Sequence, residues 1–214
     1  MARSEDLKTP LARIAFADNL FTPQQRDNGK KQWGCSLLWP KGTDLSALQN
    51  AALEAAKEEW GDKAIEMIKN EIIKNPFLDG DSKQGKNKQT GEAHAGFPGT
   101  TFIRVISGEE YRPKLVNQKV LPITSKEELY SGCFGYAVVN AFTWENKENG
   151  KGISFGVSMI QKAKDGERLG GGGGRGQRRC GARHRHRRLR PRAGRLQQPR
   201  RPQADLRLVE HPRR

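Results

Sequence analysis

The stretch from Leu129 to Gly174, LYSGCFGYAVVNAFTWENKENGKGISFGVSMIQKAKDGERLGGGGG, decides the fold. Residue types alternate on both sides of the polar segment 146–151, which predicts two long β-strands joined by a turn. In the first strand, 132–144, successive side chains point to opposite faces, and the large side chains lie on one face and the small ones on the other. The bulky face carries Phe134, Tyr136, Val138, Phe142 and Trp144, and the small face carries Cys133, Gly135, Ala137, Val139 and Ala141. The small face suits the inside of a tight barrel.

The second strand, 152–162, has an apolar face opposite a polar one. Ile153, Phe155, Val157 and Met159 form the apolar face, and Ser154, Gly156, Ser158 and Lys162 lie opposite. Because Phe is among the most often buried residues, we expect Phe134, Phe142 and Phe155 to lie in the core. Tyr136, Tyr111 and Trp33 have polar tips and lie near cations, so core and surface positions stay equally open for them.

The segments before this hairpin predict a mainly β fold with a helical insertion. Strands are expected at 10–19, 31–39 and 100–107, and an extended segment at 115–123. Two helices are expected at 44–60 and 62–75, between the second and third strands. Their apolar residues recur at helical spacing: Leu45, Leu48, Ala52, Ala56 and Trp60, then Ile65, Ile68, Ile72 and Ile73. This order excludes a βαβ Rossmann pattern and favours an OB-like antiparallel β-barrel.

Composition changes abruptly at the glycine run. Residues 1–174 hold 18 Lys, 6 Arg and 22 acidic residues, a net charge of +2, whereas 175–214 hold 15 Arg, no Lys and 2 acidic residues, a net charge of +13. We therefore divide the chain into a folded domain (1–169), a glycine linker (170–174) and a disordered Arg-rich tail (175–214). Two interpretations of the tail stay open: a nucleic-acid-binding arm, or a GC-rich gene translated out of frame.

The motifs of common enzyme classes are absent from the sequence, which lacks GxxxxGK[ST], HExxH, paired CxxC and GxSxG. His94 is expected to be an inert loop residue, and Asp79 and Asp81 to form a solvated turn rather than a metal site. We expect no enzyme activity, cofactor or metal. The odd cysteine count, the polar N-terminus and the lack of a ~20-residue apolar run predict reduced thiols in a cytoplasm and no membrane span.

Aromatic residues interleaved with Lys and Arg on an antiparallel sheet are typical of a platform for single-stranded nucleic acid. Rings stack on bases and cations contact phosphates. The candidate DNA-binding residues are Lys31, Trp33, Arg104, Tyr111, Arg112, Lys114, Tyr136 and Lys162. The long polar loop 79–99 carries Lys83, Lys86 and Lys88, and two interpretations of it stay open: a flap over bound DNA, or a solvated loop.

Several segments together resemble a phage single-stranded-DNA-binding protein family. They are RIAFADNLFTPQ (13–24), NPFLDGD (75–81), GTTFIRVIS (99–107), YRPKLV (111–116), YSGCF (130–134) through Asn140, GKGISF (150–155), and QK (161–162) through DGERLG (165–170). The resemblance covers about residues 8–172, and the combination of segments is more specific than any one of them.

The resemblance implies an OB fold and sequence-independent binding of single-stranded DNA in phage replication or recombination, in the bacterial host cytoplasm. It also implies an acidic C-terminal tail that contacts phage replication or recombination proteins, whereas the tail here is strongly basic. The main alternative is an RNA-binding or nucleoid-type structural protein that binds mainly through this tail. A nuclease-like recombination enzyme is a further alternative. The oligomeric state, monomer or dimer, stays open.

Overall fold

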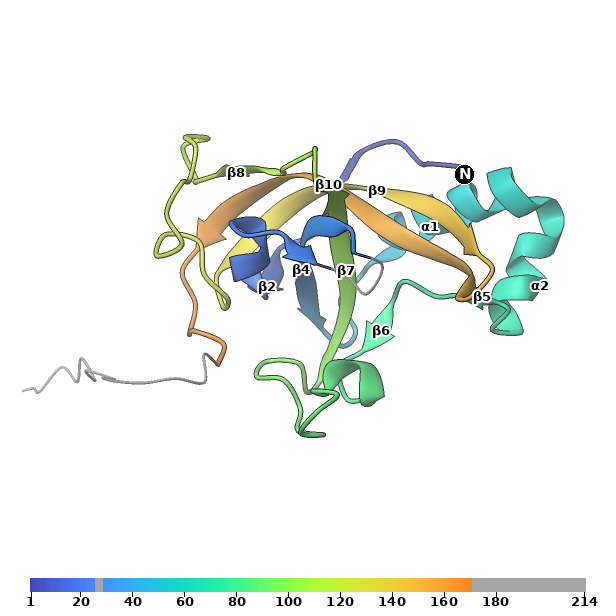
Figure 1. The fold of residues 1–214 in the computed structure, drawn as a ribbon, viewed down its shortest axis with the longest axis horizontal. Coiled ribbons are helices and arrows are strands. Elements are labelled where there is room, and N and C mark those ends of the chain that lie inside the picture. Colours follow the sequence, from blue (N-terminus) through green and yellow to red (C-terminus); the bar gives the residue numbers. More distant parts are fainter. Residues whose placement is uncertain (26–28, 171–214) are drawn as a thin grey trace, which may run out of the picture. The chain divides into compact units, whose positions relative to one another are not determined.

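Five strands close into a ring in the computed structural model, which describes residues 1–25 and 29–170. In chain order they are β2 (Ala12–Ala15), β4 (Lys31–Pro40), β7 (Thr100–Gly108), β9 (Phe134–Asn146) and β10 (Gly150–Lys164). β9 pairs with β2, β2 with β4, β4 with β7, β7 with β10, and β10 again with β9 (Figure 1). The predicted OB-like barrel is therefore confirmed.

One pairing in the ring departs from the predicted antiparallel pattern. β10 runs parallel to β7, with Phe155 opposite Val105 and Gly156 opposite Ile106. β10 also pairs in parallel with two short strands, β5 (Ile73–Lys74) and β8 (Lys114–Val116). Three further short strands lie against the ring: β1 (Leu7–Lys8) on β9, β3 (Gln24–Gln25) on β4, and β6 (Leu78–Asp79) on β7.

The inner face of β9 is built from small residues, as the sequence predicts. Gly135, Ala137, Val139 and Ala141 are buried, and a Cβ at Gly135 would lie 2.6 Å from the carbonyl oxygen of Gln161. The helix α1 (Ser46–Trp60) packs against β9 through small residues of its own, Ala51, Ala52, Ala55 and Ala56. Small side chains on both elements let the helix approach the sheet closely.

The bulky face of β9 points outward, so two of the three expected core rings are not core. Phe155 on β10 is fully buried, but Phe134 and Phe142 are half-buried on the outer face. Met159, which the sequence places on the same face as Phe155, does not share that face in the structure and is half-buried. A β-bulge at Ser158 shifts the register, because Val157 pairs with Val139 and Met159 pairs with Val138. Beyond the bulge the inward position passes to Ile160, which is fully buried.

The helical insertion is shorter than predicted. α2 spans only Ala64–Lys69, after a 3₁₀ turn at Gly61–Lys63. Glu71 has a φ of 55°, which ends the helical path, and Ile73 then enters β5. The expected buried face of this helix is therefore wrong for Ile65 and Ile72, which are exposed.

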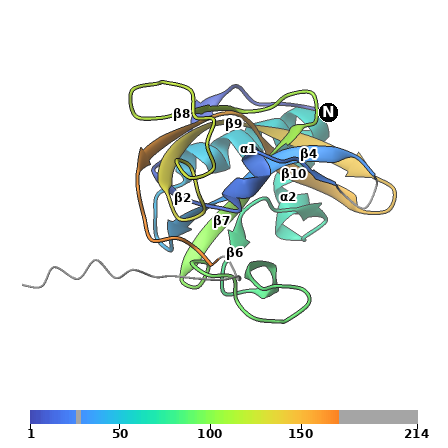
Figure 2. The same ribbon diagram turned by 60° about the vertical axis from the view of Figure 1, so that its left-hand side comes forward.

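The first strand is also shorter than its pattern indicates. β2 ends at Ala15, because Phe16 takes a φ of 57° and turns the chain into a 3₁₀ helix, η1 (Ala17–Leu20). The long loop 79–99 contains a third 3₁₀ turn, η3 (Lys83–Gly85), and lies beyond β6 beside β7 (Figure 2).

The loop 79–99 is fastened at both ends. The ammonium of Lys41 lies 2.8 Å from Asp79 Oδ1 and 2.7 Å from Asp81 Oδ2, and Gly99 donates its backbone N–H to Asp81 Oδ1 at 3.0 Å. Near the end of the loop, the buried Phe97 packs edge-on against Phe102, with 4.8 Å between the ring centroids. Asp79 and Asp81 therefore both form ion pairs with Lys41.

The described chain ends with a segment that packs back on the barrel. The single hydroxyl hydrogen of Tyr130 is shared between two acceptors, Asp165 Oδ1 at 3.0 Å and the carbonyl oxygen of Gly166 at 2.9 Å. Leu169 donates its N–H to the carbonyl of Ser131. Leu169 also packs in a small second apolar cluster with Phe97 and Phe102. Most of the predicted linker and all of the predicted tail, including Cys180, lie outside the described residues. No helix among residues 1–25 and 29–170 is long and apolar enough to cross a membrane.

We predict that Lys41→Met loosens the loop 79–99 without unfolding the barrel. Hydrogen bonds from Lys41 lower the pKa of Asp79 and Asp81, and these carboxylates raise the pKa of Lys41. The ion pair therefore stabilises the loop above the unfolded-state carboxyl pKa, about 3.9, and is lost as the pH falls through the lowered folded-state pKa.

Amide hydrogen exchange measures this effect. The protection factors of the loop amides, which are their exchange rates relative to the intrinsic rates at the same pH, should fall in Lys41→Met at neutral pH. In the unmodified chain they should fall only below about pH 4. Lys151→Met is the matched control, since it removes an exposed pair with Glu145 on the β9–β10 hairpin. Unchanged protection in Lys41→Met would show that the other contacts of the loop, such as the packing of Phe97, hold it without the ion pair.

Candidate nucleic-acid interface

A groove of about 430 Å³ crosses the outer faces of β4 and β7. Its floor consists of two cross-strand pairs, Gly34 with Ile106 and Ser36 with Arg104. A Cβ at Gly34 would come within 2.5 Å of the carbonyl oxygen of Val105, so a side chain here would clash with the backbone of β7. Because no side chain covers the floor at Gly34, a ligand can approach the backbone closely there.

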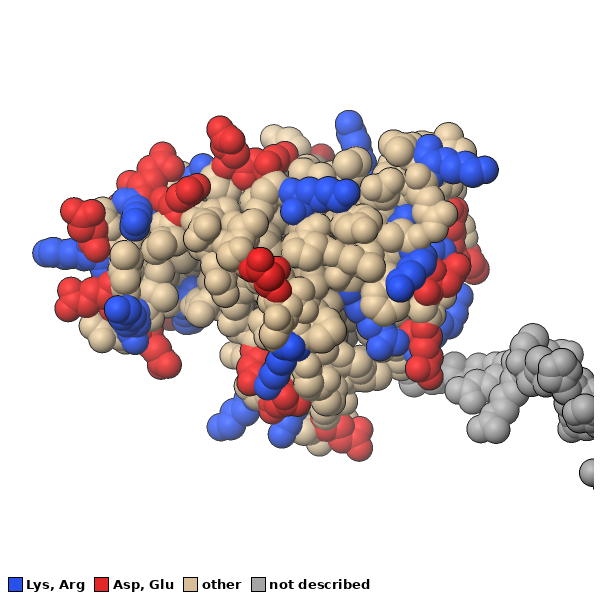
Figure 3. Space-filling model, turned by 180° about the vertical axis from the view of Figure 1, so that it is seen from behind, with Lys and Arg blue, Asp and Glu red and all other residues tan. Residues whose placement is uncertain are grey.

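Basic side chains line the groove on its loop side. Lys83, Lys86 and Lys88 come from the loop 79–99, and Arg104 comes from β7. The Arg104 guanidinium donates to the carbonyl oxygen of Gln84 at 3.2 Å, which ties the strand to the loop. On the face that Figure 3 shows, by contrast, Lys and Arg alternate with Asp and Glu. The loop therefore brings several cations to one concave surface of an otherwise balanced domain.

Aromatic side chains line another part of the groove. Phe16 meets His94 edge-to-face, with 5.1 Å between ring centroids, and Phe97 lies 5.8 Å from Phe16 and 5.5 Å from His94. Phe97 is buried, His94 is half-buried, and Phe16 is 40% exposed. His94, which the sequence places in the loop 79–99, is part of this ring cluster.

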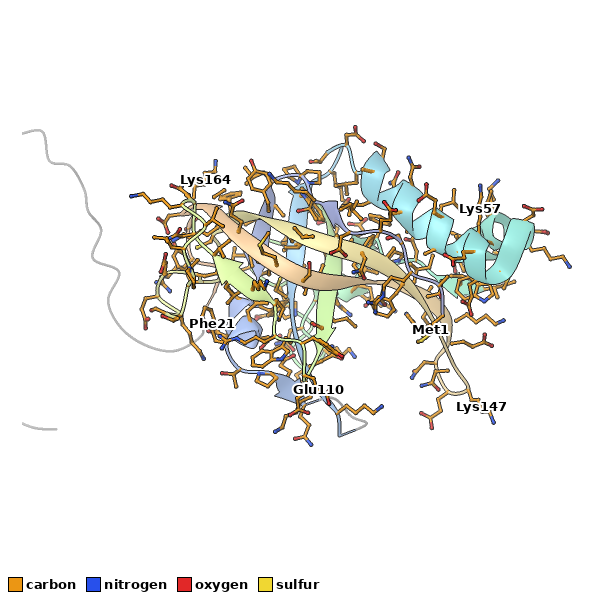
Figure 4. The ribbon with its side chains drawn as sticks, turned by 90° about the horizontal axis from the view of Figure 1, so that it is seen from above. Met1, Phe21, Lys57, Glu110, Lys147 and Lys164 are labelled. Carbon is orange, nitrogen blue, oxygen red and sulfur yellow. The ribbon has the colours of Figure 1, made fainter. Side chains whose placement is uncertain are left out.

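Four of the candidate residues gather at the end of β4 and β7. Trp33 donates its indole N–H to the carbonyl of Glu109 at 2.9 Å, and the Arg112 guanidinium lies 5.3 Å from the Trp33 ring centroid. Lys31 pairs with the Glu109 carboxylate at 3.8 Å, and Tyr111 is 72% exposed on the following turn. Figure 4 marks this end of the barrel by Glu110 and by Phe21, whose ring also lies under Arg112.

The other four candidates are spread over the barrel. Arg104 lies in the groove, and Lys114 lies on β8 beside β10. Tyr136 is on the outer face of β9, where Lys8 Nζ lies 4.1 Å from its ring centroid. Lys162 pairs with Asp165 at 2.9 Å and donates to the carbonyl of Glu128. Tyr136 and Lys162 do not line the groove.

The groove has little that could serve covalent chemistry. Cys35 is buried beside the floor, and this burial raises the pKa of its thiol to about 12, so the thiol stays protonated and unreactive at neutral pH. Within residues 1–25 and 29–170, no group of three or more His, Cys, Asp or Glu side chains could hold a metal ion.

Sequence reasoning missed Phe16 and His94, which line the groove and are candidate site residues. Phe16 lies where the sequence predicts a regular strand, and nothing in its neighbours signals the turn that takes its ring to the groove. His94 is 78 positions away along the chain. The two rings meet only because the loop 79–99 folds back over β7. The basic residues of this loop, in contrast, could be recognised from composition.

The chain matches known proteins over most of its length. Residues 5–179 match the model of the Enterobacter phage Enc34 ssDNA-binding protein family. Putative protein p50 of Acyrthosiphon pisum secondary endosymbiont phage 1 is 32% identical over 175 residues, which cover 78% of this chain and 88% of that protein.

Solved structures of phage proteins share the fold. The single-stranded DNA-binding protein from bacteriophage Enc34 in complex with ssDNA superposes with a TM-score of 0.56 at 23% identity, covering 77% of this chain and 89% of that one. The single-stranded DNA-binding protein gp2.5 of bacteriophage T7 gives 0.52 at 11% identity, covering 79% and 91%. The family match and the closed barrel agree, and the chain belongs to the Enc34 ssDNA-binding protein family.

Proposed function

We propose that this chain binds single-stranded DNA without sequence preference in phage DNA replication or recombination, through the groove across β4 and β7. The observation that carries the proposal is the place of the groove. β4 and β7 are the second and third strands of the closed ring, and OB folds bind oligonucleotides on the face of these two strands. Membership of a family of ssDNA-binding proteins, rather than of enzymes, supports the same function.

The residues of the groove suit an unpaired strand better than a duplex. Lys83, Lys86, Lys88 and Arg104 can follow the phosphates, and exposed rings can stack on bases of any type. Because residues 1–174 carry a net charge of only +2, they attract duplex DNA weakly. Selectivity for single strands then comes from the rings, since the bases of a duplex are already stacked and paired.

The strand would continue from the groove towards the cluster at the end of β4 and β7. Trp33 lines the groove and also stacks under Arg112, so it joins the two surfaces. Tyr111 extends this path with an exposed ring. Lys31 begins β4 at this end, and Lys114 begins β8 three residues after Tyr111, so both could add cations to the path. Tyr136 and Lys162 lie off this path, and their role in DNA binding stays a prediction.

The proposal includes protein partners as well as DNA. Contact with phage replication or recombination proteins, in the host cytoplasm, is part of it. The second candidate function, binding of RNA or DNA mainly by the tail, is favoured by the net charge of +13 on residues 175–214. Those residues lie outside the described part of the structure, so truncation is the direct way to separate the two functions.

We predict that residues 1–174 alone bind a single-stranded oligonucleotide more tightly than a duplex of the same length, and that both affinities fall as salt rises. Fluorescence anisotropy of labelled DNA measures both, with the full chain as the comparison. If the fragment loses all nucleic-acid binding, the tail is the main binder. Equal affinity for both forms at moderate salt would also contradict the proposal.

We predict that Lys86→Ala with Lys88→Ala weakens binding of single-stranded DNA and lowers the slope of log affinity against log salt by about 1.4, or about 0.7 for each phosphate that the protein no longer neutralises. The change is made in the 1–174 fragment, so that the Arg-rich tail contributes nothing. The matched control is Lys57→Ala with Lys69→Ala, which removes the same charge from α1 and α2, two helices that contribute no residue to the groove; Lys57 is labelled in Figure 4. Equal slopes for the two double variants would mean that the loop does not bind phosphates specifically.

We predict that Tyr111→Ala weakens single-strand binding by about 1–3 kcal/mol, the usual contribution of one stacked base, and leaves the melting temperature unchanged. The melting temperature should hold because the Tyr111 side chain is largely exposed. Tyr136→Ala is the matched comparison on the outer face of β9. Unchanged affinity in Tyr111→Ala would contradict the path proposed above, whereas a loss of affinity in Tyr136→Ala would extend the interface to the outer face of β9.

A further inference from the structure

Phe16 stands in a backbone conformation that its side chain disfavours. Its φ of 57° and ψ of 38° are in the left-handed region, where a bulky residue clashes with its own backbone. Gly or Asn adopts this conformation at far lower cost. A phenylalanine at this position destabilises the fold relative to Gly or Asn. Its presence there indicates that the phenyl ring has a role.

The turn at Phe16 has a structural purpose that does not need the ring. It brings Ala17 and Leu20 of η1 into the core, where both are fully buried. Ala17 also donates its N–H to the Ser131 hydroxyl at 3.0 Å, which fixes the turn to the segment before β9. These contacts use the backbone at position 16 and the side chains that follow it, so they explain the turn but not the phenyl ring.

The ring itself lies on the wall of the groove and stays partly open to solvent. His94 and Phe97 support it from the loop 79–99, at the centroid distances given above, while 40% of Phe16 remains exposed. Lys83, Lys86, Lys88 and Arg104 line the same groove. An exposed ring held by two others and bordered by cations is suited to a flat, uncharged group attached to a phosphate chain.

We propose that Phe16, positioned by His94, stacks on an unpaired nucleobase at this part of the groove. The inference rests on the proposed function and adds a binding residue that the sequence pattern did not reveal. Every base presents a π-face, so the contact does not depend on sequence. Paired bases in a duplex do not offer this face, so Phe16 contributes to the preference for single strands.

The test compares Phe16→Gly with the unmodified full chain on two ligands, oligothymidylate and an abasic oligomer of the same length. Glycine removes the ring and also tolerates the left-handed backbone. We expect affinity for oligothymidylate to fall about 5- to 150-fold, the equivalent of one lost stacked base, and affinity for the abasic oligomer to stay unchanged. The melting temperature should stay level or rise.

Two further variants sharpen the test. Phe142→Ala removes a half-buried ring of the same type from the outer face of β9, outside the groove, and should leave oligothymidylate binding unchanged. Phe16→Trp keeps a stacking ring, so it should restore affinity, and the added tryptophan emission should be quenched by oligothymidylate but not by the abasic oligomer.

Each outcome supports or overturns the assignment. Suppose that the unmodified chain binds oligothymidylate, and that Lys86→Ala with Lys88→Ala weakens this binding, but that Phe16→Gly binds normally. The assignment of Phe16 is then wrong, and the proposal that DNA binds in the groove still holds. An equal loss of affinity for both ligands, or a lower melting temperature with normal binding by the folded fraction, would make Phe16 a packing residue. If neither the lysine variants nor Phe16→Gly changes binding, the groove proposal itself fails.

Discussion

The structure depends on one steric constraint, the narrow inner face of β9. Glycine and alanine at alternate positions leave room for the barrel to close and for the alanines of α1 to approach. With larger residues on this face, neither the ring pairing with β10 nor the packing of the helix could form at the same spacing. The cost of small residues is a thin core, and the fully buried Trp39 and Phe155 on other strands of the ring supply much of its volume.

That constraint could be recognised in the sequence because it follows a simple alternation. In any strand with an inner and an outer face, alternate residues lie on opposite faces, so the residue types also alternate along the sequence. The departures from it could not be recognised, since each depends on a distant partner. The bulge at Ser158 is fixed by pairing with Val138 and Val139, and the early end of α2 by the pairing of Ile73 with Lys151.

The candidate site was predictable in part for the same reason. Trp33, Arg112 and Lys31 were found as aromatic and basic residues, and the fold brings them together. Composition also drew attention to the lysines of the loop 79–99. What composition cannot supply is the folding of that loop over β7, which depends on Lys41, Phe97 and Leu169. The groove exists only when those contacts form, so its aromatic wall of Phe16 and His94 has no local signal.

The double role of β10 has a consequence for the order in which the domain can form during synthesis. β10 joins β9 on one side and β7 on the other, and it is the last strand of the ring to leave the ribosome. Until residues 150–164 emerge, the nascent chain has two unpaired strand edges and an open apolar interior. A ribosome that stalls within this strand would therefore expose an intermediate prone to aggregation and proteolysis, and rapid translation of residues 150–164 would protect the chain.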